Sequence, residues 1–400
     1  MLIADTFQVT YCTNIHPGES WQTTFKSLES YVVPIKKSIC DQEPFGIGLR
    51  LSNEASKELG TGNHLEVFKK WLASQNLYVV TINGFPYGNF HGERVKDQVH
   101  QPNWTTRERV DYTIRLSQQL AELTLPGGSA GISTSPVSYK HWHTSQEDKE
   151  RVLIAGAKHL IEVVAYLYDV EKRFKKYIHL DIEPEPDGML ENTKDVLLFF
   201  KDYLLPLGYE QLKEQWKMNR SDIYRWIHRY LTVCYDVCHF ALAYELPEYT
   251  FNTLSEAGIK IGKIQVSAAL KVLFDKRKEQ EIKDALCLFD EDIYLHQVTS
   301  LTNDRVITFN DLPEFLKDTH YYEEARVHFH VPIFTEQFGI LSSTQGHILK
   351  VLEYLVSNPI STCLEIETYT WEVLPADLKY NLTDSIVREI KWLTNRLLQE

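Results

Sequence analysis

Long apolar segments are missing from this chain of 400 residues. No apolar run approaches the roughly 18 residues that a membrane-spanning helix needs. The segment from Met1 to Thr10 also lacks the basic stretch and the following apolar core that mark a secretion signal. We therefore expect a cytoplasmic protein without a membrane span.

Closely paired cysteines are missing as well. The six cysteines are scattered along the chain, and none of them forms a Cys-x-x-Cys pair. Scattered cysteines in a cytoplasmic protein are normally reduced thiols. We expect neither disulfides nor a thiolate zinc finger.

The sequence has no stripe of lysine and arginine with interleaved aromatic residues, and its formal net charge is -13. Such a charge repels the phosphates of a nucleic acid. The composition therefore predicts no nucleic-acid partner.

Glycine-rich nucleotide-binding turns are absent too: no GxGxxG follows an early strand, and no GxxxxGK[ST] occurs. Their absence argues against a doubly wound open sheet, which is the alternative architecture. The chain also lacks internal repeats, low-complexity tracts and Gly/Ser linkers. We expect residues 1–400 to form a single domain.

What the sequence does contain is an alternation of short apolar or β-branched runs with segments of helical periodicity, which is typical of parallel strands joined by crossover helices. Eight such units predict one (β/α)8 TIM barrel. The expected strands are Phe7–Thr13, Phe45–Ser52, Leu77–Gly84, Gly131–Pro136, Tyr177–Glu183, Leu231–Cys238, Gly262–Ala268 and Cys363–Thr368. Two further strand-like runs, Ile293–Thr299 and Arg326–Phe334, indicate an insertion at about residues 271–342, before the last strand.

Polar residues alternate with apolar ones inside several of these runs. A barrel strand is buried on both sides, so residues of one parity face the helices and those of the other face the barrel interior. In residues 178–183 the inward parity belongs to His179, Asp181 and Glu183. The corresponding polar residues of three other runs are Glu365 and Glu367, His328 and His330, and Asp236, with His239 following at the end of its strand.

Inward carboxylates need compensation, because a buried charge without a partner costs several kcal/mol. A single inward residue of this kind is more often an ion-pair partner in the core than a ligand, but several together favour a metal site. Glu183, Asp236, His239 and Glu367 fall at or just past strand ends, where barrel active sites lie. Carboxylate and imidazole donors suit a divalent ion such as Mn, Mg or Zn. Asp181 and Glu365 lie deeper and are expected to support the ligands.

Polar residues after other strands are candidates for binding a substrate. They are Asn14, His16, Arg50, Asn83, His91 in the loop from Gly84 to His100, and Gln265 on the seventh strand. The loop is richer in aromatic, basic and histidine residues than a plain connection needs. Its alternative interpretation is a packed surface loop without ligand contacts.

Six blocks of the chain resemble the metabolite traffic protein EboE family. They are TYCTNIHPGE at residues 10–19, NGFPYG at 83–88, RVKDQVH at 94–100, HLDIEPEPDG at 179–188, CYDVCH at 234–239 and LEIETYTWEVLP at 364–375. That family is similar to the xylose isomerase-like barrels, which include sugar isomerases, epimerases and endonuclease IV. The resemblance implies a place in a metabolite-traffic pathway and a functional association with membrane proteins of the same operon.

The superfamily usually carries a Glu after the fifth strand, Asp-x-x-His after the sixth, a His on the seventh and a Glu on the eighth. Glu183, Asp236 with His239, and Glu367 match that pattern, whereas Gln265 stands where the seventh-strand histidine is expected. We expect His330 of the insertion to supply the missing imidazole, and His328 to lie deeper and contact the substrate.

Two functions follow from this resemblance. The first is a divalent-metal-dependent isomerase or epimerase for a small sugar-like metabolite such as a sugar phosphate, with Glu183 and Glu367 as acid and base. The second is a non-catalytic protein that binds the same metabolite and hands it over.

Overall fold

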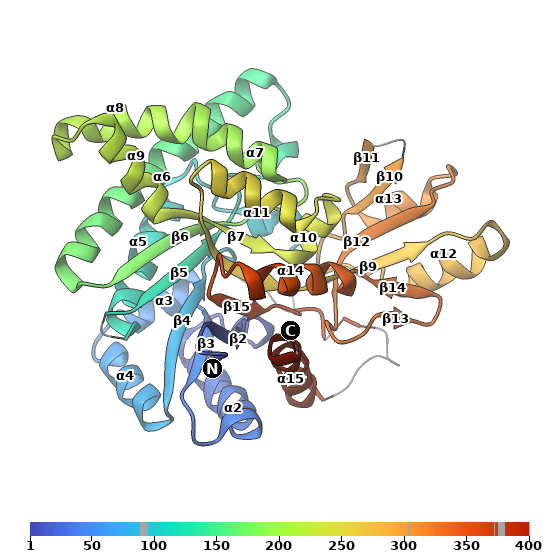
Figure 1. Ribbon diagram of the computed structural model, residues 1–400, viewed down its shortest axis with the longest axis horizontal. Coiled ribbons are helices and arrows are strands. Elements are labelled where there is room, and N and C mark those ends of the chain that lie inside the picture. Colours follow the sequence, from blue (N-terminus) through green and yellow to red (C-terminus); the bar gives the residue numbers. More distant parts are fainter. Residues whose placement is uncertain (89–94, 126, 303–304, 372, 375–380, 400) are drawn as a thin grey trace.

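Eight parallel strands form the centre of the molecule (Figure 1). The computed structural model describes residues 1–88, 95–125, 127–302, 305–371, 373–374 and 381–399. The strands are β2 (Phe7–Tyr11), β3 (Phe45–Arg50), β4 (Leu77–Asn83), β5 (Ser129–Thr134), β6 (Tyr177–Ile182), β7 (Leu231–Asp236), β8 (Ile261–Val266) and β15 (Cys363–Ile366). Each overlaps one of the eight strands predicted from the sequence, and the predicted (β/α)8 barrel is confirmed.

The barrel is nearly closed. Its sheet runs in the order β1-β2-β15-β8-β7-β6-β5-β4-β3, where β1 (Leu2–Ile3) pairs antiparallel with β2. The seam between β2 and β3 is crossed by an isolated parallel bridge from Cys12 to Gly48. Beside it, the hydroxyl of Thr10 donates to the carbonyl oxygen of Gly46 at 2.7 Å and accepts from Gly48 N at 3.0 Å.

Helices surround the barrel because each buries one apolar face against the strands. In the last helix, Ile386, Ile390, Leu393 and Leu397 are buried at a spacing of three or four residues. The surrounding helices are α1 (Trp21–Ser27), α2 (Val33–Cys40), α3 (Asn53–Leu59), α4 (His64–Ser74), α5 (Arg107–Leu123), α6 (Gln146–Phe174), α7 (Thr193–Leu198), α8 (Leu205–Trp216), α9 (Arg220–Tyr230), α10 (Val237–Leu242), α11 (Pro247–Glu256), α14 (Gln345–Ser357) and α15 (Leu382–Gln399).

The barrel interior is charged. Lys263 and Glu365 are fully buried and form an ion pair with an Nζ–Oε2 distance of 2.6 Å, and Lys263 also donates to Ser133 Oγ at 3.0 Å. Glycines make room for the acidic side chains: a Cβ at Gly131 or at Gly262 would overlap the carboxylate of Asp181. The inward side chains predicted for Asp181 and Glu365 therefore lie in a polar core. Glycines of other strands leave the space that these two side chains fill.

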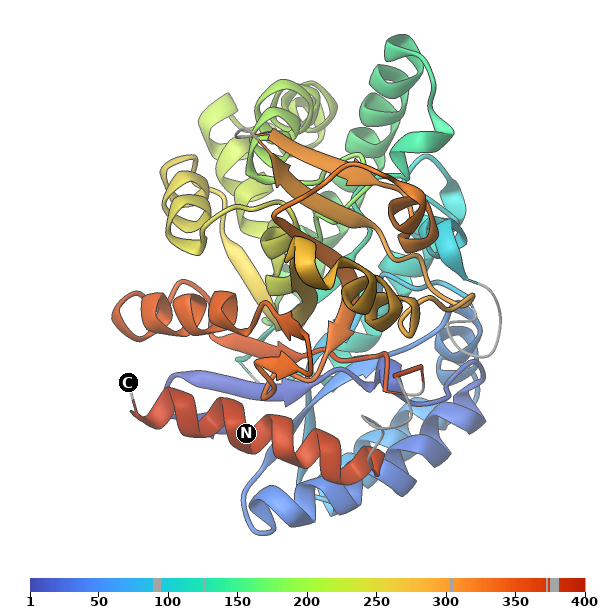
Figure 2. The same cartoon turned by 90° about the vertical axis from the view of Figure 1, so that its right-hand side faces the viewer.

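A second, antiparallel sheet forms the insertion and lies over the carboxyl-terminal end of the barrel (Figures 1 and 2). It begins directly after β8 and spans residues 268–343. Its strands are β9 (Ala268–Leu273), β10 (Val298–Thr302), β11 (Arg305–Phe309), β12 (Glu324–Val331), β13 (Gln337–Phe338) and β14 (Leu341–Ser343), and its helices are α12 (Glu279–Cys287) and α13 (Leu312–Lys317).

One predicted strand of the insertion is displaced. The sequence predicts a strand at Ile293–Thr299, but the extended pairing starts only at Val298. The preceding residues bind elsewhere, because Ile293 O accepts hydrogen bonds from Val95 N at 2.8 Å and Lys96 N at 3.1 Å. The apolar residues before Val298 therefore serve as a docking segment for the loop after β4.

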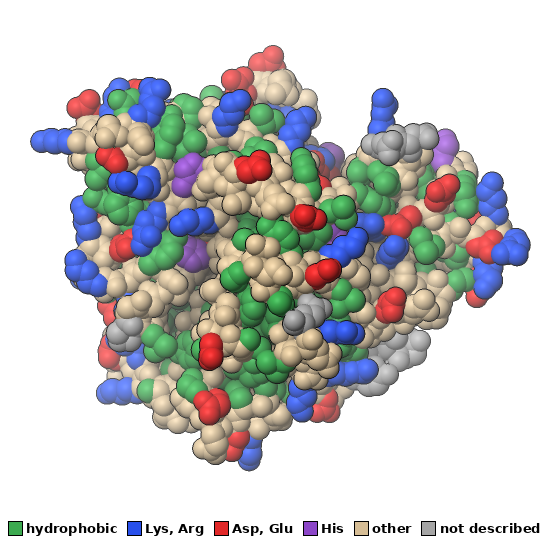
Figure 3. All heavy atoms as spheres, in the orientation of Figure 1, with side chains coloured by type: hydrophobic (Ala, Val, Ile, Leu, Met, Phe, Trp, Pro, Cys, Tyr) green, Lys and Arg blue, Asp and Glu red, His purple; other side chains and the backbone are tan. Residues whose placement is uncertain are grey.

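The described helices include none that is both long and apolar enough to cross a membrane. On the face seen in Figure 3, acidic and basic side chains of the described residues are interspersed and form no continuous basic stripe.

Candidate metal centre

Four predicted ligands converge at the carboxyl-terminal mouth of the barrel. Glu183 directly follows β6, Asp236 ends β7, His239 lies in α10 and Glu367 follows β15; all four are buried. Carboxylate oxygens of Glu183, Asp236 and Glu367 lie within 4.8 Å of one another. Ligand atoms of Asp236, His239 and His330 also lie within 4.8 Å of one another. The structure thus brings together all five residues that the sequence predicts as metal ligands.

Asp236 and His239 are arranged by the start of a helix. Asp236 is the N-cap of α10, and its Oδ1 accepts from the backbone N of His239 at 3.1 Å and from Ser267 Oγ at 2.7 Å. An N-cap side chain normally binds the amide of the second or third residue of the helix, which explains the Asp-x-x-His spacing. The other oxygen, Oδ2, is buried and makes no hydrogen bond within the described chain.

Backbone carbonyl oxygens fix the proton position in two histidines. His239 Nδ1 lies 2.9 Å from Pro184 O, and His330 Nδ1 lies 2.6 Å from Glu367 O. A carbonyl oxygen can only accept, so each of these Nδ1 atoms carries a proton, and Nε2 is the nitrogen with the lone pair when the ring is neutral.

His328 follows the same rule through a side-chain amide. Its Nδ1 lies 2.8 Å from Gln297 Oε1, while Gln297 Nε2 donates to Pro186 O at 3.2 Å. This second bond identifies the atom facing His328 as the amide oxygen. His328 Nε2 therefore also presents a lone pair, and it lies 3.1 Å from His239 Nε2.

Two lone pairs at this distance repel each other unless a proton or a cation lies between them. Burial lowers the pKa of His328 well below its ordinary value, and the neighbouring His239 lowers it further. Burial also lowers the pKa of His330, whose buried Nε2 has no hydrogen-bond partner among the described residues. Neutral imidazoles with free Nε2 atoms are the form that binds metals.

The carboxylates also fit a cation. Burial raises the pKa of Glu183 well above its ordinary value, and the charges of Glu367 and Asp236 raise it further. Burial also raises the pKa of Glu367 well above its ordinary value, and the charges of Asp236 and Glu365 raise it further. Glu183 Oε2 is buried without a hydrogen-bond partner in the described part of the chain. A divalent ion would offset this crowding of negative charge.

Asn14 and Asn83 bind a carboxylate of the cluster. Asn14 Nδ2 donates to Glu367 Oε1 at 2.7 Å, and Asn83 Nδ2 donates to the same oxygen at 2.9 Å. Both asparagines also line the cavity above the cluster. Their amides orient Glu367, in addition to the substrate contacts that the sequence predicts.

Three other predicted substrate residues lie outside the cavity lining. His16 Nε2 lies 2.9 Å from Tyr11 OH, and its ring stacks on Tyr31. Arg50 is buried in an ion pair with Glu19 at 3.0 Å. Gln265 Oε1 accepts from Cys234 Sγ at 3.0 Å inside the barrel. His328 does line the cavity, and the predicted residue His91 lies outside the described residues.

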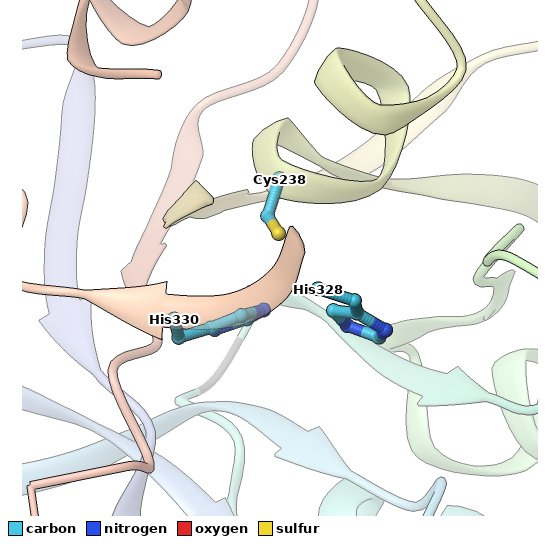
Figure 4. A group of neighbouring side chains, drawn as sticks. All are labelled: Cys238, His328 and His330. Carbon is cyan, nitrogen blue, oxygen red and sulfur yellow. The ribbon is translucent and has the colours of Figure 1, made fainter. Parts of the chain in front are cut away.

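Residues that the sequence analysis did not select complete the site. Gln297 sets the tautomer of His328, and Tyr369 packs on His330 with ring centroids 4.6 Å apart. Cys238 of α10 lies close to His328 and His330 of β12 (Figure 4), with ligand atoms of all three within 4.8 Å. Burial raises the pKa of the Cys238 thiol well above its ordinary value. No sequence signal identifies Gln297, because its role depends on how the insertion folds over the barrel.

A cavity of about 650 Å³, partly open to solvent, lies directly above the cluster. Glu183, His239, His328, His330 and Glu367 line its floor. The arrangement can hold a divalent ion and present it, with two carboxylates, to a small ligand.

The strand order and the nearly closed sheet define a (β/α)8 barrel, and its fold is similar to that of xylose isomerase-like TIM barrels. A xylose isomerase-like TIM barrel protein from Mycobacterium smegmatis, in complex with magnesium, is similar to this chain with a TM-score of 0.52 and 9% identity, over 100% of this chain and 99% of that chain. A D-tagatose 3-epimerase-like protein has a TM-score of 0.50 and 11% identity, over 98% and 97% of the two chains. A xylose isomerase domain protein from Planctomyces limnophilus has a TM-score of 0.50 and 10% identity, over 98% of each chain.

At these identities the similarity shows the fold alone. No protein-family model matches the sequence, and no curated protein matches it. The resemblance noted in the sequence is confirmed at the level of the fold, and the EboE family stays a prediction.

Proposed function

We propose that this protein is a metal-dependent isomerase or epimerase that acts on a small, sugar-like hydroxycarbonyl metabolite. The observation that carries the proposal is a buried cluster of ligand atoms that share Asp236: those of Glu183, Asp236 and Glu367, and those of Asp236, His239 and His330, lie within 4.8 Å of one another. The phosphorylated sugars expected from the sequence are one subclass of such metabolites.

Glu183, Asp236, His239, His330 and Glu367 would hold the ion, with His328 as a further ligand. Mixed carboxylate and imidazole donors suit Mn, Mg or Zn, and the Mycobacterium smegmatis protein of the same fold is in complex with magnesium. When bound, such an ion polarises a carbonyl or hydroxyl group and makes the adjacent carbon-bound proton more acidic.

Glu183 and Glu367 would transfer the proton. Asn14 and Asn83 hold Glu367 through Oε1 and keep its carboxylate in one orientation. Glu183 would act as the acid, since its buried Oε2 has no hydrogen-bond partner among the described residues. The pair thus offers one acid and one base at the ends of β6 and β15.

One observation favours a second candidate, a protein that binds the metabolite and hands it over without turnover. Gln265 replaces the expected seventh-strand histidine and is hydrogen-bonded to Cys234 within the barrel. The site therefore depends on histidines of the insertion. In this candidate role, membrane proteins of the same operon would receive the ligand, as the EboE resemblance implies.

Both candidates treat residues 1–400 as one cytoplasmic barrel domain with an insertion. Loading the purified protein with Mn²⁺, Mg²⁺ or Zn²⁺ and measuring bound metal by mass spectrometry tests the centre. Glu183→Ala and Asp236→Ala should each lose the metal, whereas Glu353→Ala, at an exposed position of α14, should retain it. Unchanged stoichiometry in the first two variants would contradict the ligand assignment.

Incubation of the metal-loaded protein with aldoses and ketoses in deuterated water separates the two candidates. Deuterium at the carbon next to the carbonyl, lost in Glu183→Gln and Glu367→Gln, supports the enzyme. Binding of a sugar without exchange supports the handover protein.

A further inference from the structure

The cavity above the candidate metal centre has a polar floor and an apolar wall. The floor carries the carboxylates, the histidines and the two asparagines. Phe85 and Pro86 after β4, Val95 and Val99 of the following loop, and Leu295 of the insertion form the wall. The two halves present different chemistry to the two ends of one ligand.

The wall is a built structure. Ile293 O accepts from the backbone N atoms of Val95 and Lys96, which joins the loop to the insertion. Lys96 Nζ lies 2.6 Å from Asp311 Oδ2. The carboxylate of Asp311 is itself fixed, because its Oδ1 accepts from His296 N at 3.0 Å and Leu312 N at 3.1 Å. The apolar side chains on both segments therefore face the cavity from a hydrogen-bonded frame.

The charges around the cavity disfavour an anionic ligand. Glu183, Glu185 and Glu367 all line it. Lys96 is the only lysine or arginine among the described lining residues, and Asp311 neutralises it. His100 Nε2 is similarly paired with Glu185 Oε1 at 2.9 Å. A phosphate carries about two negative charges and is commonly bound by free arginine or lysine side chains, which the described lining residues do not supply.

We infer that the ligand is an uncharged hydroxycarbonyl compound with an apolar body, a hydrocarbon chain or ring, that packs against Val95, Val99 and Leu295. This inference rests on the proposed function, since the hydroxycarbonyl end occupies the metal centre. The apolar body takes the place that a phosphate would have in a sugar phosphate.

The experiment uses the full-length, metal-loaded protein and a series of α-hydroxyketones whose alkyl tail lengthens from methyl to butyl. Isothermal titration calorimetry should show Kd falling about fourfold for each methylene that enters the wall, the factor that corresponds to roughly 0.8 kcal/mol. Dihydroxyacetone phosphate should bind no more tightly than dihydroxyacetone. A constant Kd along the series, tighter binding of the phosphate, or no binding of any member would overturn the inference.

Two wall variants locate the effect. Val99→Asn and Leu295→Asn change half-buried side chains and should each lose most of the dependence on tail length. Leu246→Asn, a matched change at an exposed leucine, should keep the dependence of Kd on tail length. If all three variants kept the wild-type dependence, the tail would bind somewhere other than this wall. Metal content measured on the same samples separates the outcomes. If the unchanged protein binds no metal, the proposed function is contradicted. If it binds metal but Kd does not depend on tail length, this inference alone is contradicted.

Discussion

His239 Nε2 and His328 Nε2 lie 3.1 Å apart although each ring carries its proton on the opposite nitrogen. The two oxygen atoms that accept hydrogen bonds from the Nδ1 atoms come from different parts of the chain, namely Pro184 after β6 and Gln297 in the insertion. The pair therefore forms only when the insertion is folded over the barrel. A cation between or beside the two nitrogens relieves their repulsion, which couples metal binding to the seating of the insertion.

Removing the support of His328 should weaken metal binding. Gln297→Leu frees the ring to rotate and to change tautomer, and loss of such a supporting partner typically costs ten- to hundredfold in metal affinity. His328→Ala and His330→Ala should cost at least as much. Competition titration with a chelating dye measures the effect. His320→Ala, at an exposed histidine of the insertion, is the control, and wild-type affinity in Gln297→Leu would show that the tautomer is not set by this amide.

The glycines of the barrel interior should not tolerate a methyl group. Gly262→Ala would force its Cβ against Asp181 and Thr232, and overpacking of this kind typically costs about 1–3 kcal/mol of unfolding free energy. Gly346→Ala is the matched control, because no atom lies within 4 Å of the added Cβ. Urea denaturation of both variants decides the matter, and equal stability would mean that the Asp181 side chain moves away without cost.

The ion pair inside the barrel should be sensitive to the loss of one partner. Lys263→Met leaves Glu365 buried without its cation, a change that typically costs about 3–5 kcal/mol. The double variant Lys263→Met/Glu365→Leu should recover most of that loss, because no charge then remains buried. A double variant less stable than Lys263→Met would contradict this account of the interior.

Glu389 should make stability depend on pH. It lies on α15, where its Oε1 accepts from Thr368 Oγ1 at 2.7 Å and Ile333 N at 3.2 Å, and burial raises its pKa to about 8. The ordinary pKa of a glutamate is 4.5, and in the folded protein the pKa of Glu389 is raised. The protonated side chain therefore contributes its full stabilisation below pH 4.5, and this contribution is lost as the pH rises toward 8.

Glu389→Gln should flatten that dependence and be more stable than the unchanged protein at the upper end of the range. The difference should grow by up to about 1.4 kcal/mol for each pH unit. Denaturation curves at several pH values measure it, with the exposed Glu353→Gln as control. A constant difference across the range would show that Glu389 does not titrate there.

Strand parity predicts much of the centre. Glu183, Asp236 and Glu367 meet because residues of one parity in a barrel all face the same interior, which is a property of local sequence. The positions of His16 and Arg50 depend instead on how the chain turns after β2: His16 bonds back to Tyr11 at the end of that strand, and Arg50 at the end of β3 pairs with Glu19 in the turn. The tautomers of His328 and His330 depend on acceptors more than thirty residues away. Nothing in the sequence next to either histidine encodes such pairings.

The seam between β2 and β3 has a mechanical consequence for Glu367. Of the two asparagines that hold its Oε1, Asn14 follows β2 on one side of the seam, and Asn83 ends β4 beyond the other side. The carboxylate therefore ties together the two edges of a split ring whose backbone is joined there by a single bridge. If the two edges moved apart, one of the two hydrogen bonds from the asparagine amides to Glu367 would lengthen. The position of this carboxylate is therefore linked to the diameter of the barrel.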